Sequence, residues 1–259
     1  MTIPKVPTQP SKGSRFYVDE ATGERQPGVT SIINMLAKPG LRYWFAKMVA
    51  EEAVESFSTV LDLVGKQRQD DAIDFLKRAP GRRSGKAADT GTIVHGLVEQ
   101  LNKGEDPGPV HPDYEGFINR YRTFLDDWQP EFIEVEQTLW NSTVGYAGTA
   151  DAIAKVQGEV VVLDLKTGAS GIYPEAALQL SAYANAEFVM EPNGTRRPLP
   201  PIEAAAAVHL RPEKCQVIPI RLGTDVFETF VALRRVFLWE TDIKQGVVGR
   251  PVDPDKESE

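Results

Sequence analysis

Residues 146–168 read YAGTADAIAKVQGEVVVLDLKTG, and this stretch decides the fold. Gln157-Gly158 is a natural hairpin turn that divides it into two apolar halves. The second half is a continuous apolar run, as expected for a strand with both faces covered. The stretch therefore predicts two adjacent antiparallel strands, and a two-residue turn pairs Val156 with Glu159.

Three charged side chains lie on these strands: Asp151 on the first, and Asp164 and Lys166 on the second. Residues two apart in a strand share a face, so Asp164 and Lys166 point the same way. The register places Asp151 directly opposite Asp164, with Cβ atoms roughly 4.5–5.5 Å apart. Two carboxylates at that distance repel each other, and a divalent cation between them removes the penalty. The alternative is a structural ion pair between Asp164 and Lys166, with Asp151 hydrated.

Helices before and after these strands carry further polar side chains. Gln179 and Tyr183 are four residues apart in a predicted helix, so they share a helix face. His95 lies among apolar residues of a helix predicted over 88–102. It is either a packed core residue or a ligand, because neutral imidazole binds Mn²⁺ well. Gly91, one turn earlier, would let this helix approach the sheet closely.

The rest of the chain predicts an α/β protein. Strand patterns occur at 131–140, 145–156, 159–168, 203–211 and 215–222. Helical patterns occur at 41–57, 88–102, 113–128, 174–190 and 225–243. We divide the chain into a flexible N-terminus (1–14), a helical N-terminal region that contributes the His95 helix (15–130), a core (131–246) and an acidic flexible tail (247–259).

Composition excludes several classes of protein. Of 259 residues, 41% are hydrophobic and 25% charged, which excludes wholesale disorder, collagen and a coiled-coil rod. The single cysteine, Cys215, excludes an intramolecular disulfide, a cysteine-cluster zinc site and a four-cysteine iron–sulfur site. The net charge of −8 excludes a basic coat over the whole surface, but not a local basic path. Without a membrane-length apolar run or an apolar leader, we expect a cytoplasmic protein.

Four short motifs follow one another along the chain: Gly91-x-x-x-His95, Gly148-Thr-Ala-Asp151, Asp164-Leu-Lys166 and Gln179-x-x-x-Tyr183. In this order and spacing they resemble the RecB-like branch of the PD-(D/E)XK nuclease superfamily. The match looks like the phage exonucleases related to the CRISPR adaptation nucleases, without the iron–sulfur cluster of some relatives. The resemblance implies a restriction-endonuclease-like mixed β-sheet flanked by helices, with a helical N-terminal elaboration.

The resemblance also implies a metal site. Asp151, Asp164 and the backbone carbonyl of Leu165 would hold one or two Mg²⁺ or Mn²⁺ ions, with His95 as a further ligand. The first core strand of this family often carries a glutamate, for which Glu136 is the candidate. Glu134 competes with it, because it has the same facing parity.

The remaining matching positions are implied to act on the substrate. Lys166 would orient or deprotonate the attacking water and stabilise the charge of the transition state, and Gln179 and Tyr183 would brace Lys166 and the DNA strand. Phosphodiester hydrolysis needs an activated water and a neutralised anionic transition state, which metal ions held by carboxylates supply. An adjacent lysine adds a group that transfers a proton or stabilises charge.

A basic stretch at 81–87, GRRSGKA, superficially resembles a phosphate loop. It is one residue short between its glycines and lacks the Ser or Thr that would bind Mg²⁺, so we expect no ATP site. Arg82, Arg83 and Lys86 instead form a candidate DNA-contacting patch, or a hydrated run of charge.

We therefore expect a metal-dependent DNA exonuclease, phage-encoded and active in recombination or replication in the host cytoplasm. Its expected partners are DNA and a phage helicase, recombinase or annealing protein, and no membrane. The alternatives are a structure-specific endonuclease, an RNA-directed enzyme, and a non-catalytic DNA-binding or assembly module on a nuclease fold. The intact set of Asp151, Asp164 and Lys166 argues against the last.

Overall fold

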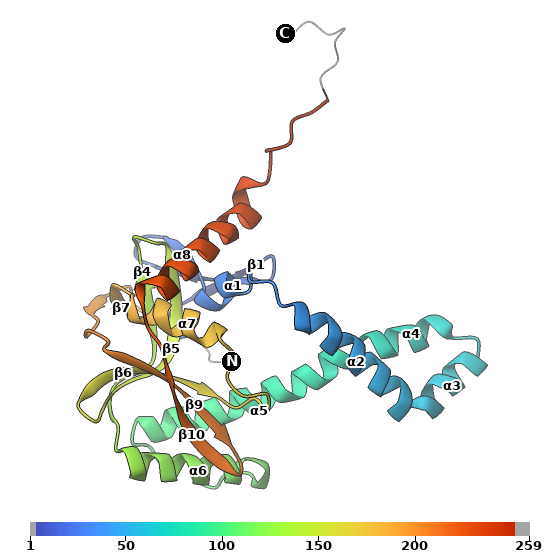
Figure 1. The fold of residues 1–259 in the computed structure, drawn as a ribbon, viewed down its shortest axis with the longest axis horizontal. Helices are drawn as coiled ribbons and strands as arrows, with labels where there is room; N and C mark the ends of the chain where they lie inside the picture. Colours follow the sequence, from blue (N-terminus) through green and yellow to red (C-terminus); the bar gives the residue numbers. More distant parts are fainter. Residues whose placement is uncertain (1–3, 252–259) are drawn as a thin grey trace, which may run out of the picture.

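The computed structural model describes residues 4–251 and contains a seven-stranded sheet with helices on both faces (Figure 1). The strands lie in the order β10-β9-β6-β5-β4-β7-β8. Their bounds are β4 (Glu131–Asn141), β5 (Tyr146–Val156), β6 (Glu159–Lys166), β7 (Phe188–Met190), β8 (Arg196–Pro198), β9 (Ala204–Arg211) and β10 (Lys214–Ile220). Neighbouring strands are antiparallel except β6 and β9, which are parallel. The predicted α/β class with a mixed sheet flanked by helices is confirmed.

The helices form two layers and an arm. Their bounds are α1 (Val29–Ile33), α2 (Pro39–Glu55), α3 (Phe57–Gly65), α4 (Gln69–Lys77), α5 (Ala79–Asn102), α6 (Pro112–Trp128), α7 (Glu175–Ala184) and α8 (Thr224–Leu238), which continues into a π-helical turn (Trp239–Ile243). Helices α1, α7 and α8 cover one face of the sheet, and α5 and α6 cover the other. The arm consists of α2, α3, α4 and the first turns of α5, which extend away from the sheet (Figure 1). None of the described helices is long and apolar enough to cross a bilayer.

Each face of the sheet has its own apolar core. Val162 packs into the core beneath α7 and α8, whereas Leu163 and Leu165 pack into the core beneath α5 and α6. This alternation is the period of two that a strand imposes. It leaves Asp164, between the two leucines, on the side of α7, where it contacts Lys166, so the predicted shared face of Asp164 and Lys166 is confirmed.

The N-terminal region differs from the expectation. Residues 8–11 were expected to be flexible, but they form β1 (Thr8–Ser11), which pairs with β2 (Ser14–Val18) and, through it, with β3 (Arg25–Pro27). Val6 is only 2% exposed and packs with Tyr17 and Trp140, and this burial explains the order. Residues 1–3 and 252–259 of the predicted flexible ends lie outside the described residues.

The helix predicted over 174–190 is also too long. It ends at Ala184, and residues Phe188–Met190 form β7, which pairs with β4 at the edge of the sheet. A short apolar run such as Phe-Val-Met is compatible with either a helix or a strand, and here the open edge of β4 decides the outcome.

Candidate metal centre

The site is built on the β5–β6 hairpin, whose register is the predicted one. Val156 pairs with Glu159 and Ala152 with Leu163, and the turn residues Gln157 and Gly158 have positive φ, as a type I′ turn requires. Within the described residues, the paired ladder ends at Ala152–Leu163. Asp151 and Asp164 come directly after this last pair, one on each strand.

The two carboxylates do not make the symmetrical face-to-face pair that the register predicted. Oδ2 of Asp151 accepts a hydrogen bond from the backbone N–H of Leu165 at 2.7 Å. Its other oxygen lies towards His95 of α5, whereas Asp164 contacts Lys166 and Gln179. The β5–β6 ladder thus ends here, whereas β6 stays paired with β9 as far as Lys166.

Glu136 lies opposite Asp151 across β4 and β5, since the residues on either side of each pair with one another. Its φ is 51°, in the left-handed region that residues other than glycine rarely adopt. The alternation of side chains between the two faces of β5 is interrupted at the same place. Ala150 and Ala152 are two residues apart, yet Ala150 packs into the core with Ile153 and Ala152 into the other core. Glu136 is also only 4% exposed. A strained backbone and a buried carboxylate each cost free energy, and this combination is typical of a functional site.

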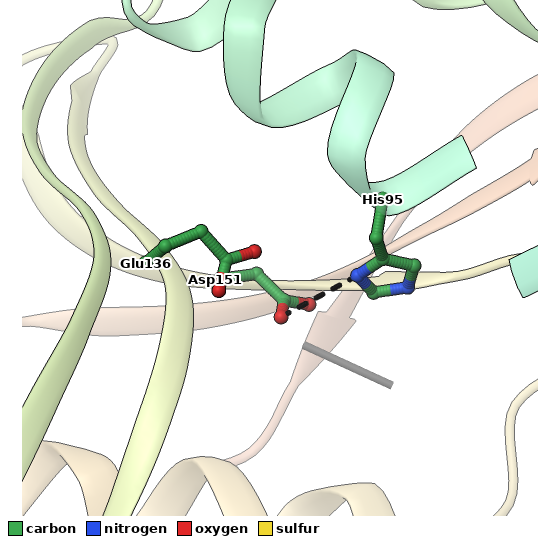
Figure 2. Close-up of side chains that lie close together, drawn as sticks. All are labelled: His95, Glu136 and Asp151. Carbon is green, nitrogen blue, oxygen red and sulfur yellow. Dashed lines mark ion pairs between the residues drawn. The ribbon is translucent and has the colours of Figure 1, made fainter. Parts of the chain in front are cut away.

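Glu136, Asp151 and His95 together form the candidate metal centre (Figure 2). One ligand atom from each lies within 4.8 Å of the others. Nδ1 of His95 is 3.6 Å from Oδ1 of Asp151 and, within the described part of the chain, this buried nitrogen makes no hydrogen bond. At Gly91, one turn earlier, a Cβ would lie 3.3 Å from Oγ1 of Thr167, so α5 approaches the end of β6 closely, as predicted.

The donors fit a divalent cation in number, type and space. A cavity of about 20 Å³ lies beside them, and it is also lined by Glu99 and Asn102 of α5. This volume suits a single water molecule or small ion. Two carboxylates and a neutral imidazole are donors that Mn²⁺ accepts, and the carboxylates suit Mg²⁺.

Asp164 is the centre of a second group of polar side chains. Lys166 Nζ lies 2.9 Å from Oδ1 and 2.7 Å from Oδ2 of Asp164. Gln179 of α7 donates to Oδ1 of Asp164 at 2.9 Å and to the hydroxyl of Tyr183 at 3.3 Å, and accepts from Lys166 at 3.3 Å. The shared helix face of Gln179 and Tyr183 is therefore turned towards Lys166: Gln179 contacts the ammonium group directly, and Tyr183 contacts Gln179.

The pKa values of Asp151 and Asp164 are shifted in opposite directions. Burial raises the pKa of Asp164 to about 6, the charge of Asp151 adds to this effect, and Lys166 opposes it. Burial alone would raise the pKa of Asp151 too, but His95, Lys166 and the amide of Leu165 outweigh burial and lower it. The Asp151 carboxyl group is thus readily ionised, whereas the Asp164 carboxyl group resists ionisation, although both belong to one hairpin.

A pocket of about 350 Å³ connects the metal centre with the Asp164 group. Its walls include residues that sequence reasoning missed, Arg15 and Tyr17 of β2 among them. The hydroxyl of Tyr17 accepts from the backbone N–H of Thr149 and also hydrogen-bonds its side chain, both at 3.1 Å. Glu99 was missed as well, although its position four residues after His95 on a helix is a visible signal.

Several predicted residues have other partners. Glu134 shares the parity of Glu136, but it forms a two-point ion pair with Arg197 at 2.7 and 3.0 Å and lies outside the cluster. Arg82 of the arm pairs with Glu52 at 2.9 Å and stacks over Phe75, so contacts within the arm occupy it. The side chains of Arg83 and Lys86 lie outside the described part of the structure. Leu165 lines both cavities, and the role of its carbonyl stays a prediction.

Comparison with known proteins adds little to this geometry. No family model matches the chain, and no curated protein matches it. Part of the chain is similar to the crystal structure of SSO0001, with a TM-score of 0.30 and 18% identity. The similarity covers 49% of this chain and 57% of that one, and a TM-score this low carries no argument about fold or function.

Proposed function

We propose that this protein is a divalent-metal-dependent deoxyribonuclease, an exonuclease of the RecB-like PD-(D/E)XK superfamily with a restriction-endonuclease-like core. One observation carries the proposal: His95 and Asp151 of the candidate metal centre line the same open pocket as Lys166, whose ammonium group is held by the buried Asp164. DNA is the proposed substrate, and phage recombination or replication, alongside a helicase, recombinase or annealing protein, is the proposed setting.

His95, Glu136 and Asp151 would hold the metal ion, which is Mg²⁺ or Mn²⁺ in this proposal. What such an ion supplies when bound is Lewis acidity towards a phosphodiester and its attacking water. The chain prepares for it by keeping Asp151 ionised, through the lowered pKa of this carboxyl group. Nδ1 of His95 makes no hydrogen bond within the described residues, and this supports the same assignment, because a buried ring nitrogen without a hydrogen bond costs free energy unless a ligand binds it.

Lys166 supplies the positive charge that the protein itself brings to the reaction. Its side chain is 37% exposed, whereas that of Asp164 is almost fully buried. The ammonium group is therefore held by a buried carboxylate and remains accessible from the pocket. A fixed ammonium in this position can donate to a phosphoryl oxygen and orient a water molecule without reorganising first. Gln179 limits its movement by contacting both Lys166 and Asp164.

The test is cleavage of end-labelled single- and double-stranded DNA in Mg²⁺, in Mn²⁺ and in EDTA. We expect metal-dependent release of nucleotides from the ends by the wild type, and a loss of about 100-fold or more in turnover for Lys166→Met. This variant should bind Mn²⁺ like the wild type, since lysine is not a ligand. Lys155→Met, which removes an exposed lysine of β5, is the matched control. A wild type that cleaves no DNA with either metal, or a Lys166→Met variant with normal turnover, would refute the proposal.

A further inference from the structure

Two side chains of β9 hold the loop that follows Lys166. Nε2 of His209 lies 2.8 Å from the carbonyl oxygen of Gly168, and since a carbonyl only accepts, Nε2 is the donor. Nη1 of Arg211 donates to the carbonyl oxygen of Thr167 at 2.6 Å. Two consecutive backbone carbonyls are thus bound by two side chains that are two residues apart on one strand.

The position of this contact follows from the parallel pairing of β6 and β9. The last residue of β6, Lys166, pairs with His209. Beyond Lys166 the chain leaves the sheet, and the ladder no longer fixes the peptides of Thr167 and Gly168. Strand β9 continues for two more residues beyond His209. Where the backbone pairing with β6 ends, side chains of β9 bind the backbone carbonyls of the segment that follows β6.

Both holding residues are themselves fixed. His209 is only 5% exposed, and the guanidinium of Arg211 lies 5.7 Å from the ring centroid of Phe117 on α6. On the opposite side, Thr167 packs against Gly91 of α5, where even a methyl group would be a tight fit. The loop is therefore held between β9 and the helix that carries His95.

The held segment borders the candidate active site. Lys166, Thr167 and Gly168 all line the pocket that joins the metal centre to the Asp164 group. Lys166 is the last residue of β6. The end of a strand frays unless another contact holds it. A displacement of about 1 Å at a reacting group costs roughly 100-fold in rate, so the orientation of this segment matters for Lys166.

We propose that His209 and Arg211 are positioning residues: by binding the carbonyls of Thr167 and Gly168 they fix the end of β6 and thereby the ammonium group of Lys166. The inference rests on the proposed nuclease function. Its consequence is that these two residues govern turnover rather than the affinity for DNA or metal, because they act through the loop and not on the substrate.

The chain offers matched variants for the test. His209→Leu removes the donor and keeps the bulk, whereas His209→Gln retains an N–H group that can reach the same carbonyl. Arg211→Met removes the second donor. Arg234→Met is its control, because Arg234 of α8 likewise donates to a loop carbonyl, that of Gly145 at 2.6 Å, but on a loop that does not line the pocket.

We would measure kcat and KM on end-labelled DNA in Mn²⁺, together with amide hydrogen exchange over residues 165–171 in metal-free protein. We expect His209→Leu and Arg211→Met to lower kcat by about tenfold or more, to leave KM within about twofold, and to accelerate exchange in this segment. His209→Gln should recover most of the kcat, and Arg234→Met should change neither quantity.

The outcomes separate this inference from the proposed function. A wild type without metal-dependent cleavage would overturn both. A cleaving wild type with folded His209→Leu and Arg211→Met proteins of normal kcat would overturn the positioning role alone. So would an equal loss in Arg234→Met, because the effect would then be one of general stability.

Discussion

Replacing Asp164 with asparagine is expected to stabilise the metal-free protein at neutral pH, although it removes an ion pair. Asp164 is 2% exposed, and burial together with the charge of Asp151 raises the pKa of its carboxyl group to about 6 even though Lys166 is adjacent. The folded protein therefore pays a cost for ionising this group. Asparagine has nearly the same shape and carries no charge to bury.

The magnitude follows from the pKa. A rise from 3.8 to about 6 corresponds to about 3 kcal/mol of stability that is present below pH 4 and lost as the pH rises through 6. The sign follows because the folded state binds more protons than the unfolded state across this window. Asp164→Asn lacks this dependence, so at pH 7 we expect its free energy of unfolding to exceed that of the wild type by up to about 3 kcal/mol.

Urea unfolding of both proteins in EDTA, at steps from pH 4 to pH 8, measures the difference directly. The difference in the free energy of unfolding, variant minus wild type, should grow from near zero at pH 4 and level off above pH 6. Asp126→Asn, which neutralises an exposed carboxylate of α6, should show no such growth. An advantage that stays flat across this range, or shrinks as the pH rises, would refute the reasoning about the buried carboxylate.

Two further substitutions test the packing around the site. In Gly148→Ala, the new methyl group would lie 2.7 Å from Cε1 of Tyr183 and 3.0 Å from Cγ2 of Val29, so urea unfolding should show a loss of about 1–3 kcal/mol; wild-type stability would contradict this close approach. Arg197→Met leaves the carboxylate of Glu134 buried without its two-point partner and should cost about 2–3 kcal/mol of stability, less than for a fully buried pair. Calorimetry should find an unchanged Mn²⁺ affinity; a tighter affinity would show that the freed Glu134 binds the metal.

Local rules were enough to predict the scaffold of the site. The Gln157-Gly158 turn sets the strand register, and helical spacing sets the shared face of Gln179 and Tyr183. Each of these predictions rests on contacts between residues close in sequence, where geometry leaves few choices.

His95, Asp151 and Glu136 were all candidates from the sequence, but the choice of Glu136 over Glu134 depended on features that the sequence does not display. The alternation of side chains along a strand places Glu134 and Glu136 on the same face, and two structural features distinguish them: the left-handed backbone at Glu136 and the ion pair of Glu134 with Arg197. No local sequence pattern indicates that Arg197, which lies far from Glu134 in the sequence, forms an ion pair with it. The contribution of Tyr17 was missed for the same reason, because its contact with Thr149 joins segments more than a hundred residues apart.

The central claim is that His95, Glu136 and Asp151 hold a divalent cation, and calorimetric titration of Mn²⁺ tests it most directly. Glu136→Gln is the decisive variant, and Glu131→Gln, which changes an exposed glutamate of the same strand, is its control. We predict saturable binding by the wild type and by Glu131→Gln, and an affinity at least about tenfold weaker in a folded Glu136→Gln protein. Equal Mn²⁺ affinity in all three proteins, or no binding by the wild type, would contradict the account.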